Sequence, residues 1–145
     1  MRTLDSRQVV VTETVCVHES NGPKQRFLFR GGSPFLSEAD GYERSPEFAM
    51  GAGRLDGKAV AWIGGGFCIG PRVFAIADCS QTVYEIEPSL QEFCPKGIEF
   101  IPGDWKDTIK GKYDVIIFDL GGEVPRADLA KNLNAGGIIL PKDDK

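Results

Sequence analysis

Short apolar runs alternate with helix candidates along the chain from residue 58 onward, and this alternation limits the possible folds more than any other feature. The helix candidates are Pro71–Asp78, Pro88–Phe93 and Pro125–Leu133, and each begins at a proline. Strands that alternate with helices indicate a parallel sheet covered on both faces. The sequence therefore predicts an α/β fold with about five parallel strands. The expected strands are Ala59–Ile63, Thr82–Ile86, Ile98–Ile101, Tyr113–Phe118 and Gly137–Leu140.

The first part of the chain has a different pattern. Residues 9–18 are rich in valine, and alternate valines share one parity, which predicts a single strand with one apolar face. These valines are Val9, Val11, Val15 and Val17. A turn signal at residues 20–23 is followed by short strand candidates at Arg26–Phe29 and Pro34–Leu36. We therefore expect a small antiparallel β-hairpin region over about residues 8–36.

A loop and a short helix are expected between the two parts. Ser37–Gly41 has the composition of a loop. Ser45 is a suitable N-cap for a helix whose first residue is Pro46. The character of the chain changes soon afterwards, and we expect two regions, residues 1–53 and 54–145.

Composition excludes several classes of protein. The net charge is −4 and no basic run occurs, which argues against binding to nucleic acid. No apolar stretch reaches the ~20 residues of a membrane span, and residues 1–8 lead into no apolar segment of a signal peptide. The 4 cysteines lack CxxC spacing and only 1 histidine is present, so no metal site is expected. These features favour a cytoplasmic protein with reduced thiols.

The ends of the expected strands carry the residues most suited to chemistry. Ligands of an open parallel sheet bind outside the carboxyl ends of its strands, near the point where strand order reverses. Four successive strands end in glycines or in a carboxylate, all of which would lie on one edge of the sheet. The residues are Gly64, Gly65, Gly66, Glu85, Asp104 and Asp119.

The spacing and type of these residues favour a nucleoside. Glu85 lies 21 residues after Gly64, close to the ~20 typical of an acidic residue that accepts ribose hydroxyls. Ile69 breaks the GxGxxG pattern, and no phosphate-binding GxxxxGK[ST] loop occurs. Asp104 is suited to an adenine amino group or to a helix cap, and Asp119 to a cationic ligand, a base or a structural role. Together these residues suit a cationic nucleoside such as S-adenosylmethionine. The alternative is that the glycines form only a tight turn and that the carboxylates are solvated.

The order of these segments resembles the spermidine synthase (aminopropyltransferase) family, within the S-adenosylmethionine-dependent methyltransferase fold. The stretch HESNGPKQRFLFRGGSPFLSEADGYERSPEF is similar to the hairpins and linker of that family, and AVAWIGGG, VYEIEP, IPGDW and YDVIIFDL follow in the family's order. The resemblance implies a β-hairpin region with a linker at 1–53 and a Rossmann-like nucleoside-binding domain at 54–145. Its ligand would be S-adenosylmethionine or decarboxylated S-adenosylmethionine, with methylthioadenosine as the product of aminopropyl transfer.

The resemblance also implies a role for each site residue. The glycines would form the nucleoside-binding loop, the glutamate would hold the ribose hydroxyls and the first aspartate would meet the adenine edge. The cofactor-binding residues are then Gly64, Gly65, Gly66, Glu85 and Asp104. Asp119 matches the catalytic aspartate of the family.

Several features depart from the family pattern. Phe67 stands where an acidic residue usually follows the glycines, and Gly122 replaces a second aspartate, with Glu123 one place further on. Loss of two carboxylates weakens binding of a polycationic amine. The sheet is also truncated at the C-terminus relative to the family, which leaves an exposed edge for a partner chain to cover. Because the N-terminal hairpins assemble subunits in the family, a homo-oligomer is expected.

Three functions are compatible with these residues. The first is transfer of an aminopropyl or methyl group from the sulfonium to an unidentified acceptor. The second is a non-catalytic nucleoside-binding or structural oligomeric protein. The third is cleavage of S-adenosylmethionine without an acceptor. In each case the expected partner is a small-molecule nucleoside, with no nucleic acid and no membrane.

Overall fold

The computed structural model describes residues 8–10, 15–18, 25–30 and 33–142, with side chains described for residues 45–142. Its main feature is a five-stranded sheet in the order β7-β6-β5-β8-β9, in which every neighbouring pair is parallel. The predicted α/β fold with a parallel sheet is therefore confirmed. The strands are β5 (Ala59–Ile63), β6 (Ser80–Glu85), β7 (Glu99–Pro102), β8 (Tyr113–Phe118) and β9 (Leu133–Leu140).

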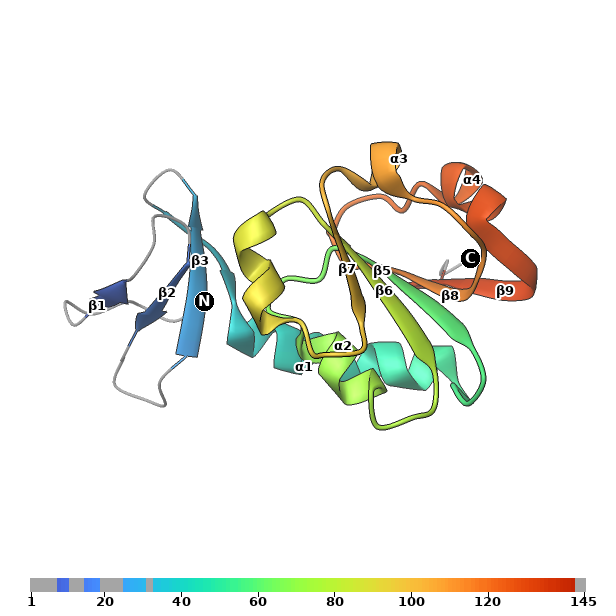
Figure 1. The fold of residues 1–145 in the computed structure, drawn as a ribbon, viewed down its shortest axis with the longest axis horizontal. Coiled ribbons are helices and arrows are strands. Elements are labelled where there is room, and N and C mark those ends of the chain that lie inside the picture. The colour runs from blue at the N-terminus through green and yellow to red at the C-terminus, as the bar shows by residue number, and fades with distance from the viewer. Residues whose placement is uncertain (1–7, 11–14, 19–24, 31–32, 143–145) are drawn as a thin grey trace.

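The connections between these strands are short helices. They are α2 (Ile69–Phe74), the 3-10 helix η1 (Pro88–Phe93), α3 (Trp105–Thr108), α4 (Arg126–Leu129) and the 3-10 helix η2 (Ala130–Asn132). Figure 1 shows α1 (Glu38–Ala52) and α2 on one side of the sheet and α3 and α4 on the other. Within the described residues, no helix combines the length and apolar character needed to cross a membrane.

Two of the predicted helices are wrong in extent. The helix expected at 71–78 ends at Phe74, because the N–H groups of Ile76 and Ala77 donate to carbonyls three residues earlier and tighten the chain into turns. The helix expected at 125–133 is divided into α4 and η2. It stops before Leu133 because that residue pairs with Tyr113 and extends β9 toward its N-terminus.

The core fills both faces of the five-stranded sheet. One face carries a cluster around Trp62, whose ring makes edge contacts with Phe48 (centroids 6.0 Å apart) and Phe74 (4.8 Å). The opposite face carries a cluster around Ile63 and Ile116, both fully buried. Neighbouring residues of one strand thus enter different clusters, as alternation along a strand requires. The central strands β5 and β8 are apolar almost throughout because both of their faces are covered.

The N-terminal region forms a second sheet. Its strands are β1 (Gln8–Val10), β2 (Val15–His18), β3 (Gln25–Arg30) and β4 (Ser33–Ser37), paired antiparallel in chain order. This confirms the predicted antiparallel hairpin region. The single strand expected at 9–18 is wrong, since Val9 pairs with Val17 across two antiparallel strands. Parity alone does not reveal such a reversal, and Val11 lies outside the described residues.

A long helix, α1 (Glu38–Ala52), replaces the loop and short helix expected there. Ser45 and Pro46 lie inside it rather than at its start. A proline inside a helix removes a backbone hydrogen bond, and here the loss is offset by packing on the sheet. Phe48 and Ala52 are buried in the cluster around Trp62. The helix that precedes residue 54 therefore contributes to the core of the five-stranded sheet.

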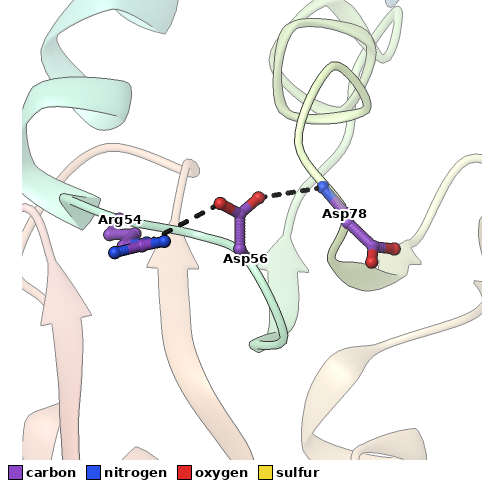
Figure 2. Close-up of polar contacts among 3 residues, drawn as sticks. All are labelled: Arg54, Asp56 and Asp78. Atoms are coloured by element: carbon purple, nitrogen blue, oxygen red, sulfur yellow. Dashed lines mark hydrogen bonds and ion pairs between the residues drawn. The ribbon is translucent and has the colours of Figure 1, made fainter.

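The amino ends of β5 and β6 are joined by polar contacts (Figure 2). The Asp56 carboxylate accepts a hydrogen bond from the N–H of Asp78 (3.3 Å) and lies 3.7 Å from the Arg54 guanidinium. The N–H of Gly57 donates to the Asp78 carbonyl (2.7 Å). Arg54 and Asp56 are exposed, so their ion pair contributes little to stability. The backbone bonds instead fix where the two strands begin.

Asp114 connects β8 to both of its neighbours. One carboxylate oxygen accepts from the N–H of Ala59 in β5 (2.9 Å), and the other accepts from the Asn134 side chain in β9 (3.1 Å). These donors favour the ionised form and hold the pKa of Asp114 below its ordinary value. The carboxylate therefore stabilises the fold above the ordinary pKa, and this contribution is lost as the pH falls through the lowered one.

We expect Asp114→Asn to lower the free energy of unfolding near neutral pH. The difference from the unsubstituted protein should shrink as the pH falls below about 4, where the native carboxylate also takes up a proton. Urea unfolding at a series of pH values measures this difference. Asp107→Asn, at an exposed position of α3, is the matched control. A stability difference that stays constant over the whole pH series would contradict the assignment.

Candidate functional site

Backbone hydrogen bonds bring four strand ends to the same edge of the sheet. The N–H of Asp119 donates to the Ile63 carbonyl (2.9 Å), and the N–H of Gly64 donates to the Tyr84 carbonyl (2.8 Å). The N–H of Gly103 donates to the Glu85 carbonyl (3.0 Å). The chain runs from β5 outward to β7 and then returns to β8, so strand order reverses between β5 and β8. The predicted residues thus follow strands at or beside the point where open sheets bind ligands.

Close packing requires glycine at the first two of the three positions after β5. A Cβ atom on Gly64 would lie 2.5 Å from Leu120 Cδ2, and one on Gly65 would lie 2.4 Å from Val83 Cγ1. Gly64 and Gly66 also have φ of +86° and +54°, which residues with a side chain adopt rarely. The loop therefore presents bare backbone at this edge of the sheet.

The Glu85 carboxylate holds this loop. Its Oε1 accepts from the N–H groups of Gly66 (2.9 Å) and Gly65 (3.2 Å), and its Oε2 accepts from the N–H of Glu87 (2.9 Å). The residue is only 7% exposed. A carboxylate has about four acceptor positions, and three bonds are made here to the backbone. Sequence spacing placed Glu85 beside the glycines, but it did not reveal that the side chain fastens them.

The two aspartates occupy different environments. Asp104 is exposed, and its Oδ1 accepts from the N–H of Lys106 (3.0 Å), so it caps α3 as the capping alternative predicted. Asp119 is half-buried at the end of β8, and its main chain continues the ladder to β5. The structure therefore brings both aspartates to the edge that holds Glu85.

Two apolar residues at this edge were missed by the sequence reasoning. Ile86 and Leu120 directly follow Glu85 and Asp119, and they are 56% and 53% exposed. Large apolar side chains this exposed are informative when they cluster with polar groups in a possible site. The sequence does contain a signal for these two residues, because each immediately follows a carboxylate at the end of a strand.

The residue after the glycine loop faces the protein interior. Phe67 is 3% exposed and packs with Leu90 and with the ring of Phe93, whose centroid is 5.2 Å away at 76°. Gly122 is exposed and has φ of +73°. The spermidine synthase pattern has a carboxylate at each of these two positions. Here Phe67 makes an apolar contact instead, and Gly122 forms part of a turn.

The cysteine in the loop is not activated by the helix that follows it. Cys68 caps α2 and is fully buried, and burial raises the pKa of its thiol well above the ordinary range. Cys68, Cys79 and Cys94 are free thiols. Within the described part of the chain, no group of three or more His, Cys, Asp or Glu side chains is placed to hold a metal ion.

Three solved structures with a similar fold are methyltransferases. A SAM-dependent methyltransferase from Thiobacillus denitrificans, in complex with S-adenosyl-L-homocysteine, matches with a TM-score of 0.57 and 20% identity over 67% of this chain and 46% of its own. A protein-L-isoaspartate O-methyltransferase matches with a TM-score of 0.63 and 18% identity, over 88% of this chain and 41% of its own. The glycopeptide N-methyltransferase MtfA, complexed with S-adenosyl-L-methionine, matches with a TM-score of 0.55 and 18% identity, over 77% of this chain and 57% of its own.

These likenesses, together with the five-stranded parallel sheet, establish a Rossmann-like methyltransferase fold. They do not single out the spermidine synthase family. The chain spans about half the length of the solved structures it matches. No protein-family model and no curated protein matches it.

The role of Glu85 in holding the loop leads to a stability prediction. Glu85→Gln keeps the shape of the side chain but directs an NH₂ group at backbone donors. We expect the free energy of unfolding to fall by ~1–3 kcal/mol because a buried donor loses its acceptor. Chemical denaturation measures the change. Glu92→Gln, an exposed residue of η1, should leave stability within error, and equal effects of the two substitutions would contradict the role of Glu85.

Proposed function

We propose that this protein binds S-adenosylmethionine, or a related adenosine thioether, at the carboxyl edge of the sheet. The observation that carries the proposal is the buried Glu85 carboxylate, bonded to the N–H groups of Gly65 and Gly66 beside the reversal of strand order. The fold shared with methyltransferases supports the same ligand. Glu85 and the glycine loop are the residues that we assign to the nucleoside.

Ribose binding involves an exchange of hydrogen bonds at Glu85. The two ribose hydroxyls are donors, and three backbone donors already occupy the carboxylate. The bond to the N–H of Gly65 is the longest of the three at 3.2 Å, so we assign it as the one that a hydroxyl replaces. The released Gly65 N–H then faces the ligand. This exchange makes nucleoside binding and the position of the loop interdependent.

The other residues of the edge take complementary roles. Ile86 supplies an exposed apolar surface against the flat adenine ring. Asp104 Oδ1 is engaged in capping α3, and we assign Oδ2 to the adenine amino group. Asp119, at the end of β8, lies across the reversal point from Glu85 and is assigned to the reacting end of the ligand.

We further propose that the bound sulfonium donates an alkyl group, methyl or aminopropyl. In such a transfer the acceptor nucleophile attacks the carbon attached to sulfur, and the neutral thioether leaves with the bonding electrons. Holding the nucleophile in line with that carbon provides most of the acceleration. Asp119 would orient the acceptor or take its proton. The proposed ligands are S-adenosylmethionine for methyl transfer and its decarboxylated form, with methylthioadenosine as product, for aminopropyl transfer.

A non-catalytic nucleoside-binding protein is the second candidate. The observation that favours it is the buried Phe67, which contributes an apolar contact where the spermidine synthase pattern has an acidic residue for the amine. Gly122 likewise supplies no charge beside Asp119. Under this proposal the protein keeps the nucleoside half of the site and carries out no transfer.

Titration calorimetry tests the proposed binding. We expect S-adenosylmethionine or one of its two relatives, decarboxylated S-adenosylmethionine and methylthioadenosine, to bind at or below millimolar concentration. Glu85→Gln should weaken binding by ~1–3 kcal/mol through the ribose contact, measured where circular dichroism shows the variant folded. Glu92→Gln should bind normally. If none of the three compounds binds the unsubstituted protein, the proposal is wrong.

Product analysis then separates transfer from inert binding. The protein is incubated with each sulfonium compound, with and without putrescine as a test acceptor, and the products are identified by mass spectrometry. Alkylated putrescine that depends on Asp119 would support aminopropyl transfer, and Asp119→Asn should lower its rate by ~100-fold or more. Thioether release without putrescine would indicate cleavage or another acceptor. Binding without any product would support the second candidate.

A further inference from the structure

The exposed Leu120 side chain has no part in the proposed contacts to ribose and adenine. It directly follows Asp119 at the end of β8 and is 53% exposed. Among the large apolar side chains that are exposed between residues 45 and 142, only Ile86 and Leu120 directly follow a carboxylate at the end of a strand. An exposed apolar side chain in such a place is a feature of binding surfaces.

Leu120 covers the first residue of the glycine loop. A Cβ atom on Gly64 would lie 2.5 Å from Leu120 Cδ2 and 3.2 Å from its Cγ, so the leucine occupies the space that a side chain would need there. Because β5 lies between β6 and β8 in the sheet, the loop after β5 begins between the ends of these two strands. Leu120 therefore forms the apolar contact of the loop on the β8 side, and the rest of its side chain is accessible to a ligand.

The surroundings of Leu120 are unsuited to an anion. The N–H of Gly64 donates to a carbonyl of β6 (2.8 Å), and the N–H of Gly66 donates to Glu85 Oε1 (2.9 Å). The adjoining strands β6 and β8 also bring the carboxylates of Glu85 and Asp119 to this edge. A phosphate at Leu120 would meet like charges and an apolar surface. An uncharged alkyl group would meet neither obstacle.

We infer that Leu120 contacts the alkyl group on the sulfur of a bound adenosine thioether. This contact selects such nucleosides over those that carry a hydroxyl or a phosphate in the same position. The inference rests on the proposed function, which assigns the ribose to Glu85 and the reacting end of the ligand to Asp119. The sulfur and its substituent join these two ends, so they cross the loop at Gly64, where Leu120 lies. Contact between the alkyl group and the leucine removes apolar surface from water.

Calorimetric titration with adenosine, methylthioadenosine and adenosine monophosphate tests this selection. The unsubstituted protein should bind methylthioadenosine about fourfold more tightly than adenosine, as expected for one buried methyl-sized group, and the monophosphate most weakly. In Leu120→Ala the preference for methylthioadenosine should fall to within about twofold because the alkyl group then stays in water. A general loosening of the loop lowers both affinities and cancels in their ratio. An unchanged preference in Leu120→Ala, or a monophosphate that binds as tightly as methylthioadenosine, would overturn the inference.

Two other exposed isoleucines provide matched controls. Ile86 is assigned to the adenine ring, which the nucleosides share, so Ile86→Ala should lower the affinities alike and keep their ratio. Ile76 follows α2 and is 90% exposed, and Ile76→Ala should leave each affinity unchanged. A loss of preference in either control as large as that in Leu120→Ala would contradict the assignment to Leu120.

A measurement on the unsubstituted protein decides the case in which Leu120→Ala fails to fold or binds neither nucleoside. Nuclear Overhauser contacts are recorded between the methylthio protons of bound methylthioadenosine and leucine methyl groups. The Leu120 signals are identified by their absence from Leu120→Met. We expect a contact to Leu120, and a bound ligand without one would overturn the inference.

Failure of this inference can be distinguished from failure of the proposed function. If adenosine and methylthioadenosine bind equally well to the unsubstituted protein, the proposed function stands and the role of Leu120 is wrong. If the unsubstituted protein binds no adenosine compound, both are wrong.

Discussion

The bonds from the Gly65 and Gly66 N–H groups to the Glu85 carboxylate are the interaction on which the rest of the site depends. A buried carboxylate is costly unless its acceptor positions are filled, and here backbone donors of the loop and of Glu87 fill them. The same bonds satisfy loop N–H groups that would otherwise lack an acceptor. Folding of the loop and burial of Glu85 therefore stabilise each other. A nucleoside that uses Glu85 must compete with this internal arrangement.

The five-stranded sheet holds that loop in place because hydrogen bonds connect its strands at both their amino and their carboxyl ends. At the amino ends, Asp114 bridges β5, β8 and β9, and Asp56 joins the starts of β5 and β6. At the carboxyl ends, backbone bonds run across β8, β5, β6 and the residue after β7. Between them, the central strands β5 and β8 are buried on both faces. The carboxyl edge can therefore carry glycines and carboxylates that contribute little to the core.

The parallel sheet could be predicted because buried strands read as apolar runs, and the bounds of β8 and η1 were found in full. The extent of helix α1 could not be predicted. Pro46 is a local signal for the start of a helix, and the packing of Phe48 on Trp62 overrides that signal. The edge residues could be located from their position after strands. The bonds of Glu85, the exposure of Ile86 and the ring contact between Phe67 and Phe93 depend on tertiary packing, which spacing along the chain does not encode.

The chemistry available at the two ends of the loop differs in kind. At the Glu85 end, a carboxylate and backbone N–H groups provide both acceptors and donors, which suits ribose hydroxyls. At the other end, Phe67 is buried against Leu90 and Phe93, and this contact supplies no fixed charge. A polycationic acceptor gains most from charge-assisted hydrogen bonds, which this end of the loop does not provide. Under the proposed function, this end of the loop would therefore suit an acceptor of low positive charge better than a polyamine.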